Sequence, residues 1–217
     1  MVRIAVALAA GVYIVGQVRK PSRYVGRLFT SLMNESHSSL TDWGFGHIHI
    51  DKTATVLDVG CGGGRTIGKL AKMAKSVYGV DYAAGSVAAS CAHNKQLIEA
   101  GQVVVRHATV SALPFPDAFF DLVTAIETQY YWPDAENDMR EILRVLKPGG
   151  QLMIVAESYR GSRNDWLLGH VMRMLGSKGL SIDDHRALFQ AAGYTGIEIF
   201  EERRKGWLCA IGQKPRL

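Results

Sequence analysis

The segment VLDVGCGGG at residues 56–64 constrains the fold of this chain more than any other stretch. A short apolar run, typical of a strand buried on both faces, ends in Asp58 and leads into four glycines among the five residues 60–64. Glycine at a strand-to-helix turn lets the backbone approach a ligand closely, because no Cβ occupies the space. We therefore predict a strand, a ligand-binding glycine loop and a helix in this segment.

The chain after Thr53 alternates strand-like and helix-like segments, which implies a parallel sheet with helices on both faces. Pro133 is expected to start one helix, and KPGG at 147–150 to stop it in a turn. The last two strands are joined by only RRKG, too short for a crossover, so we expect five parallel strands and a terminal antiparallel hairpin. The predicted strands cover 54–60, 76–81, 103–107, 121–127, 151–157, 197–202 and 207–212, and the predicted helices 62–73, 83–100, 134–146, about 165–175 and 182–192.

Composition fits one folded α/β domain. The chain has 217 residues, of which 47% are apolar and 21% charged, and this excludes disorder for most of its length. Its three cysteines form no CxxC pair, which favours a reducing, cytoplasmic location over a disulfide scaffold or a zinc ribbon. His47 and His49 resemble a metal pair but lack a third ligand, so we predict no metal site.

The first 52 residues differ from the rest. Residues 1–22 form an apolar and basic segment, 23–52 a helical lid, and 53–217 the ligand-binding domain. The apolar run 4–18 is shorter than the about 20 residues that span a bilayer, which leaves three interpretations: a packed helix, a membrane-surface contact through residues 1–27, or a cleaved signal. The net charge is +5, but the basic residues are not interleaved with aromatics, so no nucleic-acid partner is expected.

A dinucleotide-binding loop is the main alternative for the glycine segment. That fingerprint, GxGxxG, places a third glycine where this chain has Arg65, so the match fails. Asp81 ends the next predicted strand, where a carboxylate accepts hydrogen bonds from ribose hydroxyls under either interpretation. The pattern therefore indicates an adenosine-containing ligand.

The ordered set of Asp58 to Gly64, Asp81, LPFPDAFFD at 113–121 and LKPGG at 146–150 resembles the class I S-adenosylmethionine-dependent methyltransferases. The resemblance covers residues 53–215. It implies S-adenosyl-L-methionine as cofactor, with S-adenosyl-L-homocysteine as product. It also implies a Rossmann-like three-layer α/β sandwich whose mostly parallel seven-stranded sheet has the order 3-2-1-4-5-7-6, with strand 7 antiparallel.

The resemblance also assigns residues to the cofactor. Asp58, Gly60 and Gly62 match positions that surround its methionine part, and Cys61 lies between them as a small filler residue. The position of Asp81 binds the ribose, and Tyr82 beside it packs on the adenine.

The remaining cofactor positions follow the third and fourth predicted strands. The backbone near Ala125 and Ile126 borders the cofactor's amino group. Thr109 stands where the family commonly has an Asp that accepts from the adenine amino group. The Thr109 hydroxyl can also accept a hydrogen bond, and Ser111 is close to it in the sequence. Backbone groups near Val110 are expected to bind the adenine as well.

The acceptor site is expected after the fourth strand, at residues 127–132, because this fold places ligands at the carboxyl ends of its strands. Glu127 is a candidate general base, but it could equally hold the cofactor's ammonium or order the loop. Tyr131 and the neighbouring aromatics either wall the pocket or pack the next helix. His37 is the other candidate acid or base, and Trp43 a candidate to face the acceptor.

We thus predict a methyltransferase acting on a small, largely apolar acceptor at sulfur or an acidic oxygen. Three alternatives remain: an enzyme of this fold acting on protein, RNA or lipid, a noncatalytic adenosine-binding domain, and a nucleotide-dependent oxidoreductase. The sequence predicts no oligomeric state.

Overall fold

The computed structural model describes residues 38–162, 165 and 179–216. From Leu40 onward the described chain belongs to one compact unit. The predictions for residues 1–37, His37 among them, and for the helix around 165–175 lie outside the described residues. None of the helices in the described part combines the length and apolar composition needed to cross a membrane.

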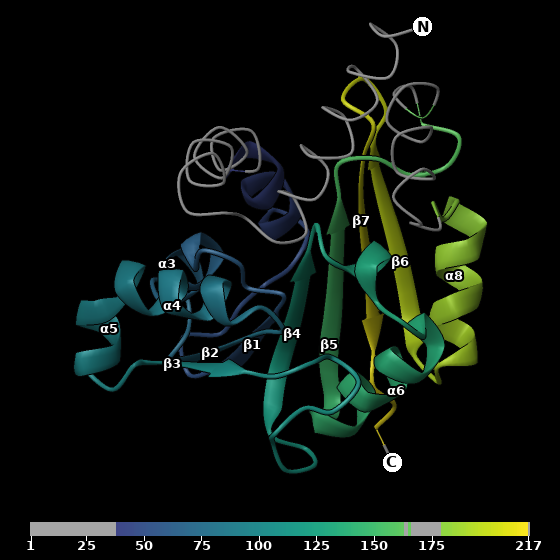
Figure 1. The fold of residues 1–217 in the computed structure, drawn as a ribbon. Helices are drawn as coiled ribbons and strands as arrows, with labels where there is room; N and C mark the ends of the chain where they lie inside the picture. Colours follow the sequence, from purple (N-terminus) through teal and green to yellow (C-terminus); the bar gives the residue numbers. More distant parts are fainter. Residues whose placement is uncertain (1–37, 163–164, 166–178, 217) are drawn as a thin grey trace, which may run out of the picture. The chain divides into compact units, whose positions relative to one another are not determined.

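The seven strands form one sheet in the order β3-β2-β1-β4-β5-β7-β6 (Figure 1). β1 to β5 pair in parallel, whereas β7 runs antiparallel to both β5 and β6. This confirms the predicted sheet order and the terminal hairpin. The strands are β1 (Thr55–Val59), β2 (Ser76–Asp81), β3 (Val103–His107), β4 (Phe120–Ile126), β5 (Leu146–Ala156), β6 (Thr195–Glu202) and β7 (Trp207–Gln213).

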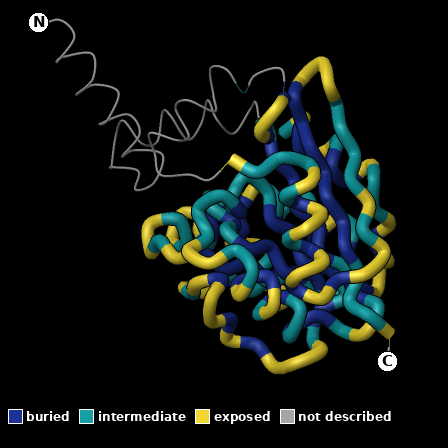
Figure 2. The backbone as a smooth tube through the Cα atoms, turned by 90° about the vertical axis from the view of Figure 1, so that its right-hand side faces the viewer, coloured by how far each residue is buried: buried dark blue, intermediate teal, exposed yellow. Residues whose placement is uncertain are grey.

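Helices lie on both faces of the sheet, because alternate residues of each strand point to opposite faces and both sets are apolar. One core joins Leu57, Val123 and Ile154 to α6 and α8. The other joins Val56 and Met153 to α3, α5 and the helix at residues 38–45. Figure 2 shows the buried strands between more exposed segments. The bounds are α3 (Arg65–Leu70), α4 (Ala84–His93), α5 (Lys95–Glu99), α6 (Ala135–Val145) and α8 (Ile182–Ala191), with a 3-10 turn η1 at Gln129–Tyr131.

The single helix predicted over 83–100 is wrong, because Asn94 divides it into α4 and α5. The Asn94 amide donates to the carbonyl oxygens of Gly64, at 2.9 Å, and Ser90, at 3.0 Å. An asparagine side chain that binds backbone groups in this way competes with helix continuation. The break therefore ties α4 to the end of the glycine loop.

The start of α6 and the KPGG turn also differ from the predictions. Pro133 lies ahead of α6, as expected, but Asp134, the predicted first residue, is the N-cap, and its carboxylate accepts from the Asn137 N–H at 3.3 Å. KPGG is not a free turn, because β5 begins at Leu146 and its register against β4 shifts between Phe120 and Leu122. A Cβ at Gly150 would lie 2.9 Å from the Lys147 carbonyl oxygen, so this close passage of the backbone requires glycine.

Candidate functional site

The glycine loop joins the carboxyl end of β1 to α3. Its first two N–H groups, of Gly60 and Cys61, donate to the carbonyl oxygen of Val80 in β2 at 2.8 and 3.0 Å. Gly60, Gly62 and Gly64 have φ angles of 72°, 51° and 81°, a region that other residues adopt only with strain. Backbone conformation alone thus explains the alternation of glycines.

The glycines of the loop meet different surroundings. A Cβ at Gly60 would collide with Thr128, whose own Cβ would lie 2.7 Å away, and a Cβ at Gly64 would lie 3.0 Å from the Ser90 Cα. A Cβ at Gly62 or Gly63 would meet no atom within 4 Å. Gly60 and Gly64 therefore allow neighbouring residues to pack closely against the loop. Gly62 and Gly63 leave the backbone accessible to a ligand, as the predicted cofactor requires.

Asp81 is fixed beside this accessible backbone. Its carboxylate accepts from the N–H groups of Gly62, at 2.9 Å, and Ala83, at 2.8 Å, and the side chain is buried. A carboxylate offers about four lone-pair directions, so it can accept further hydrogen bonds from a diol. The Tyr82 side chain beside it is 50% exposed and so presents an aromatic surface at the same edge of the sheet.

Asp58 is a buried acid at the end of β1. Burial raises the pKa of this carboxyl to about 7; the hydrogen bond from the Thr124 hydroxyl, at 2.7 Å, opposes this rise and the charge of Asp81 adds to it. A cationic group placed beside it would favour the ionised form. The geometry therefore suits a ligand ammonium.

The other predicted cofactor positions behave differently from one another. Cys61 is buried and burial raises the pKa of its thiol, which keeps it protonated. Thr109 is exposed and Val110 buried, at a short antiparallel bridge between Thr109 and Ala112. The Ser111 hydroxyl donates to Asp138 in α6 at 2.6 Å and is engaged in that contact.

Glu127 follows β4 and joins two segments of the site. Ala125 and Ile126 pair with β5, and Glu127 then adopts a left-handed conformation with φ of 56°. Its carboxylate accepts a hydrogen bond from the Tyr130 hydroxyl, at 2.5 Å, and another from the backbone N–H of Glu157. The side chain therefore links η1 to the chain that leaves β5.

The aromatic residues after Glu127 do not share one role. The rings of Tyr130 and Tyr131 meet edge to face at 4.7 Å, and burial together with the Glu127 carboxylate raises the pKa of Tyr130. Trp132 packs against the core beside α6 and α8. The ring contacts of these aromatics are therefore packing contacts, with one another or with the core.

The lid region contributes an aromatic cluster at β6 and β7. Trp43 lies 5.8 Å from the ring of Trp207, and His47 stacks on Phe200 at 4.2 Å. His49 is exposed, and the described residues contain no cluster of three or more metal-ligating side chains. The structure therefore places Trp43 and His47 in packing contacts with the two last strands.

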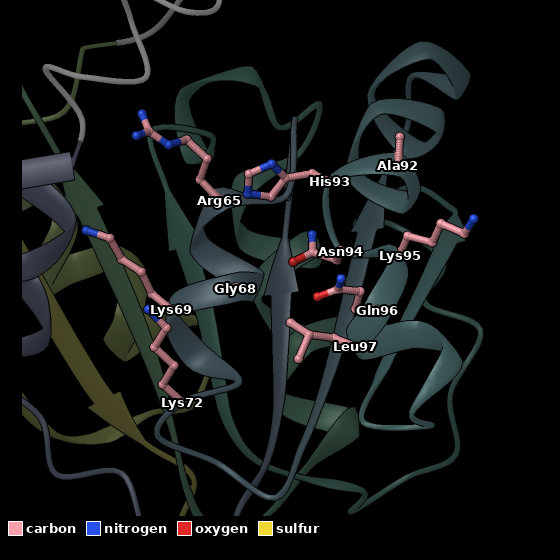
Figure 3. A pocket seen from close by; sticks show the side chains of 10 residues that line it. All are labelled: Arg65, Gly68, Lys69, Lys72, Ala92, His93, Asn94, Lys95, Gln96 and Leu97. Carbon is pink, nitrogen blue, oxygen red and sulfur yellow. The ribbon is translucent and has the colours of Figure 1, made fainter.

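A basic groove lies between α3 and the α4–α5 junction, with a volume of about 800 Å³ (Figure 3). Arg65, Lys69 and Lys72 follow one another at helical spacing along one side, and His93 and Lys95 stand on the other. No acidic residue lines it. The sequence analysis missed this groove, although the spacing of three cations by four and three residues was a visible signal.

Sequence analysis also missed two buried polar groups after β5. The Tyr159 hydroxyl donates to the Glu201 carboxylate of β6 at 2.6 Å. His185 lies on the inner face of α8 between Ile182 and Phe189, with 2% of its surface exposed. A histidine within an apolar helical stripe was the signal for the second group.

Comparison with known proteins gives independent information about the family. The profile of the "Methyltransferase domain" family matches residues 57–154. The O-methyltransferase rstn1 of Aspergillus nomiae is 31% identical over 160 residues, which make up 71% of this chain and 70% of that protein. The 27-O-demethylrifamycin SV methyltransferase of Amycolatopsis mediterranei is 29% identical over 193 residues, 83% of this chain and 70% of that one. The chain spans between 54% and 70% of the length of the first three relatives it matches.

The fold also matches solved structures. The geranyl diphosphate C-methyltransferase of Streptomyces coelicolor, in complex with Mg²⁺, geranyl-S-thiolodiphosphate and S-adenosyl-L-homocysteine, superposes with a TM-score of 0.69. The match covers 82% of this chain and 76% of that one, at 14% identity. At this identity the likeness concerns the fold alone.

Proposed function

Because the chain belongs to the class I S-adenosylmethionine-dependent methyltransferases, we propose that it methylates a small, largely apolar molecule at an acidic oxygen or a sulfur. S-Adenosyl-L-methionine is the cofactor of this family. When bound, it supplies an electrophilic methyl group: the acceptor atom loses a proton and gains the methyl, while the bonding electron pair stays with the sulfur of S-adenosyl-L-homocysteine.

The residues around the glycine loop support this cofactor. Gly62 and Gly63 leave room for a ligand against the backbone, and Asp81 is held where ribose hydroxyls can donate to it. Asp58 offers a carboxyl to the ammonium group, and Tyr82 a ring to the adenine. These side chains bind and orient, and none has to form a covalent bond.

The observation that carries the acceptor class is the engagement of Glu127. Both of its carboxylate oxygens already accept hydrogen bonds, from Tyr130 and from the Glu157 backbone. These two contacts give Glu127 a structural role, as the link between η1 and the chain that leaves β5, so we assign its side chain to positioning and not to proton transfer. The site therefore suits an acceptor that ionises readily by itself and needs only alignment and exclusion of water.

The names of the relatives favour oxygen over sulfur. The relative from Aspergillus is an O-methyltransferase, and the relative from Amycolatopsis acts, by its name, on 27-O-demethylrifamycin SV. Phenols carry an acidic hydroxyl group, so they suit both an O-methyltransferase and a site that aligns its acceptor without a general base. We therefore place phenols ahead of thiols as acceptors.

The test is a screen for release of S-adenosyl-L-homocysteine with phenols, thiols, carboxylic acids and amines. We expect turnover of phenols or thiols by the wild type, and a loss of less than about tenfold in kcat for Glu127→Gln. Turnover of amines alone, or a loss of about 10³-fold or more in Glu127→Gln, the upper range of general-base catalysis, would contradict the proposal.

The basic groove favours a second candidate, methylation of an anionic protein or lipid. Lys72 and Lys95 face this groove, and no Phe, Tyr or Trp lines it to stack on nucleic-acid bases. Under this alternative, Lys72→Glu combined with Lys95→Glu would reduce methyl incorporation into the macromolecule. Unchanged turnover of a small phenol by the same double variant supports the first candidate.

A further inference from the structure

Thr124 is a fully buried hydroxyl residue in β4, a strand whose other buried residues are apolar. Valine has nearly the same shape as threonine and fits a buried strand at least as well. A buried hydroxyl destabilises the fold unless it makes a hydrogen bond. The hydroxyl of Thr124 therefore has to be explained by a contact.

That contact is with Asp58, which is paired with Thr124 in the register of β1 against β4. Side chains at paired positions of neighbouring strands point to the same face of the sheet, and the strands lie about 4.8 Å apart. The Thr124 hydroxyl donates to Asp58 Oδ1 at 2.7 Å. On the other side of β1, Asp58 is paired with Gly79 of β2, which has no side chain. Of the two neighbouring strands, β4 therefore supplies the side-chain donor.

Asp58 is a buried acid on which no cation of the described residues acts. Burial raises the pKa of its carboxyl, the hydrogen bond from Thr124 lowers it, and the charge of Asp81 in β2 raises it. Cys61 in the glycine loop stays a neutral thiol, because burial and the charges of both acids raise its pKa. Asp58 Oδ2 accepts no hydrogen bond from the described residues. One carboxyl oxygen is thus held by Thr124, and the other is available to a ligand.

The Thr124 hydroxyl can pair with Asp58 in both protonation states, because a hydroxyl both donates and accepts. It donates to Oδ1 when the carboxyl is ionised. When the carboxyl is protonated, the acid can donate to Thr124 Oγ1, and the hydroxyl can then turn to the Leu57 carbonyl oxygen, 3.4 Å away. Asp58 can therefore lose its proton to solvent as a cation binds, and Thr124 keeps a partner throughout.

We propose that Thr124 is a positioning residue for the cofactor: it holds one carboxyl oxygen of Asp58 and favours the ionised acid, which leaves the other oxygen for the cofactor's ammonium group. Thr124 acts through Asp58 and does not itself contact the cofactor. The inference rests on the proposed function, because it takes an S-adenosyl compound as the ligand. It adds a residue of β4 to a site that the glycine motif of β1 defines.

The first measurement is the titration of Asp58 in the ligand-free full chain, followed by ¹³C NMR of the carboxyl signals and assigned with Asp58→Asn. Thr124→Val keeps the shape of the side chain and removes the hydroxyl. The midpoint of Asp58, about 7 in the wild type, should therefore rise by about one to two pH units, the size of a hydrogen bond to a charged group. Thr124→Ser keeps a hydroxyl and should titrate near the wild-type midpoint.

The second measurement is the affinity for S-adenosyl-L-homocysteine between pH 6 and pH 8.5, by isothermal titration calorimetry. In Thr124→Val the ionised fraction of Asp58 should fall, so affinity should drop at least about fivefold at pH 7 and by less at pH 8.5. Thr124→Ser should restore the wild-type profile. Thr195→Val is the matched control, because Thr195 also lies in a strand and donates to a carbonyl oxygen, that of Gln213, but at the opposite side of the sheet. It should leave both measurements unchanged.

Two results would overturn the role of Thr124. One is an unchanged midpoint of Asp58 in Thr124→Val, and the other is an equal loss of affinity at every pH, which indicates a merely structural residue. If Thr124→Val fails to fold, Thr124→Cys replaces it: a thiol is a weaker donor, so the midpoint should still rise. Failure of the proposed function is seen separately, as the expected shift of Asp58 in a chain that binds no S-adenosyl compound.

Discussion

The candidate site has two parts, named the cofactor half and the acceptor half after their proposed ligands, and they are built from different atoms. The cofactor half, at the ends of β1 and β2, consists of glycine backbone and carboxylates held by backbone N–H groups, as in the contact of Gly62 with Asp81. The acceptor half, after β4 and β5, depends on side chains that hold other side chains, such as Tyr130 on Glu127 and Tyr159 on Glu201. The backbone geometry of the cofactor half requires glycine at fixed positions. The side chains of the acceptor half can be exchanged for others, and such an exchange would change which ligand is bound.

Gly60 is where the two halves touch, and Gly60→Ala should have the largest effect. The new Cβ would collide with Thr128, and the φ of 72° adds strain. Left-handed backbone costs a non-glycine residue about 1–2 kcal/mol and overpacking about 1–3 kcal/mol, so we expect a loss of about 3 kcal/mol in the free energy of unfolding. Urea denaturation measures it.

Thr128→Ala in the Gly60→Ala background relieves part of the overpacking. It removes the threonine hydroxyl and methyl, whereas the close contact with the Cβ of residue 128, at 2.7 Å, and the backbone strain remain. Gly63→Ala, where a Cβ meets open space, is the control and should change stability by less than about 0.5 kcal/mol. Additive effects of Gly60→Ala and Thr128→Ala would show that the halves are not coupled here.

Asp81→Ala tests the cofactor half alone. We expect its affinity for S-adenosyl-L-homocysteine to fall by about 1.5–3 kcal/mol, the scale of hydrogen bonds to a charged group. Isothermal titration calorimetry measures this loss, and acceptor binding to the saturated variant should stay unchanged. Asp117→Ala, at an exposed acid outside the site, is the control. Tight NAD binding by the wild type without any response to adenosyl compounds would refute the cofactor assignment.

The pH dependence of cofactor affinity should report Asp58. Its pKa of about 7 lies well above its ordinary value, so near pH 6 most molecules carry a neutral carboxyl, which attracts an ammonium poorly. Affinity for S-adenosyl-L-homocysteine should therefore rise, by up to about tenfold, from pH 6 to pH 8. Asp58→Asn should bind more weakly and lose this slope.

The same shift affects stability in the opposite direction. A raised pKa means that the folded chain binds the proton more tightly than the unfolded chain. The resulting stabilisation of the ligand-free chain is complete below the ordinary value of 3.8 and is lost as pH rises through about 7. If the stability of wild type relative to Asp58→Asn were independent of pH between 5 and 8, Asp58 would not be the group.

Glu127→Gln should have the smallest effect and tests the acceptor half. Glutamine can still accept from the Glu157 N–H and remain beside Tyr130, so we expect thermal stability to change little and kcat by less than about tenfold. Glu127→Ala, which removes both contacts, should lower the melting temperature more than it alters chemistry. Equal and large losses of kcat in both variants would indicate a base instead of a positioning residue.

The sequence predicted the sheet well because buried parallel strands are continuous apolar runs, as at 54–60 and 151–157. It failed where a distant partner decides the local structure. Asn94 breaks a helix because Gly64 lies next to it in space, and residues 147–150 join β5 because β4 passes beside them. In the candidate site, the glycine motif predicted the turn from β1 into α3. It did not predict the contact of Glu127 with the Glu157 backbone, 30 residues further along the chain, or the burial of His185, because both depend on tertiary packing.

The position of β7 has a consequence for how the chain is made. β7 follows β6 in the sequence, yet it lies between β5 and β6 and pairs with both. During synthesis, β5 is therefore left with an unpaired edge, and β6 has no neighbour in the sheet until β7 has been made. Exposed strand edges template aggregation, so a chain that stops before β7 should be insoluble and not a slightly shortened enzyme.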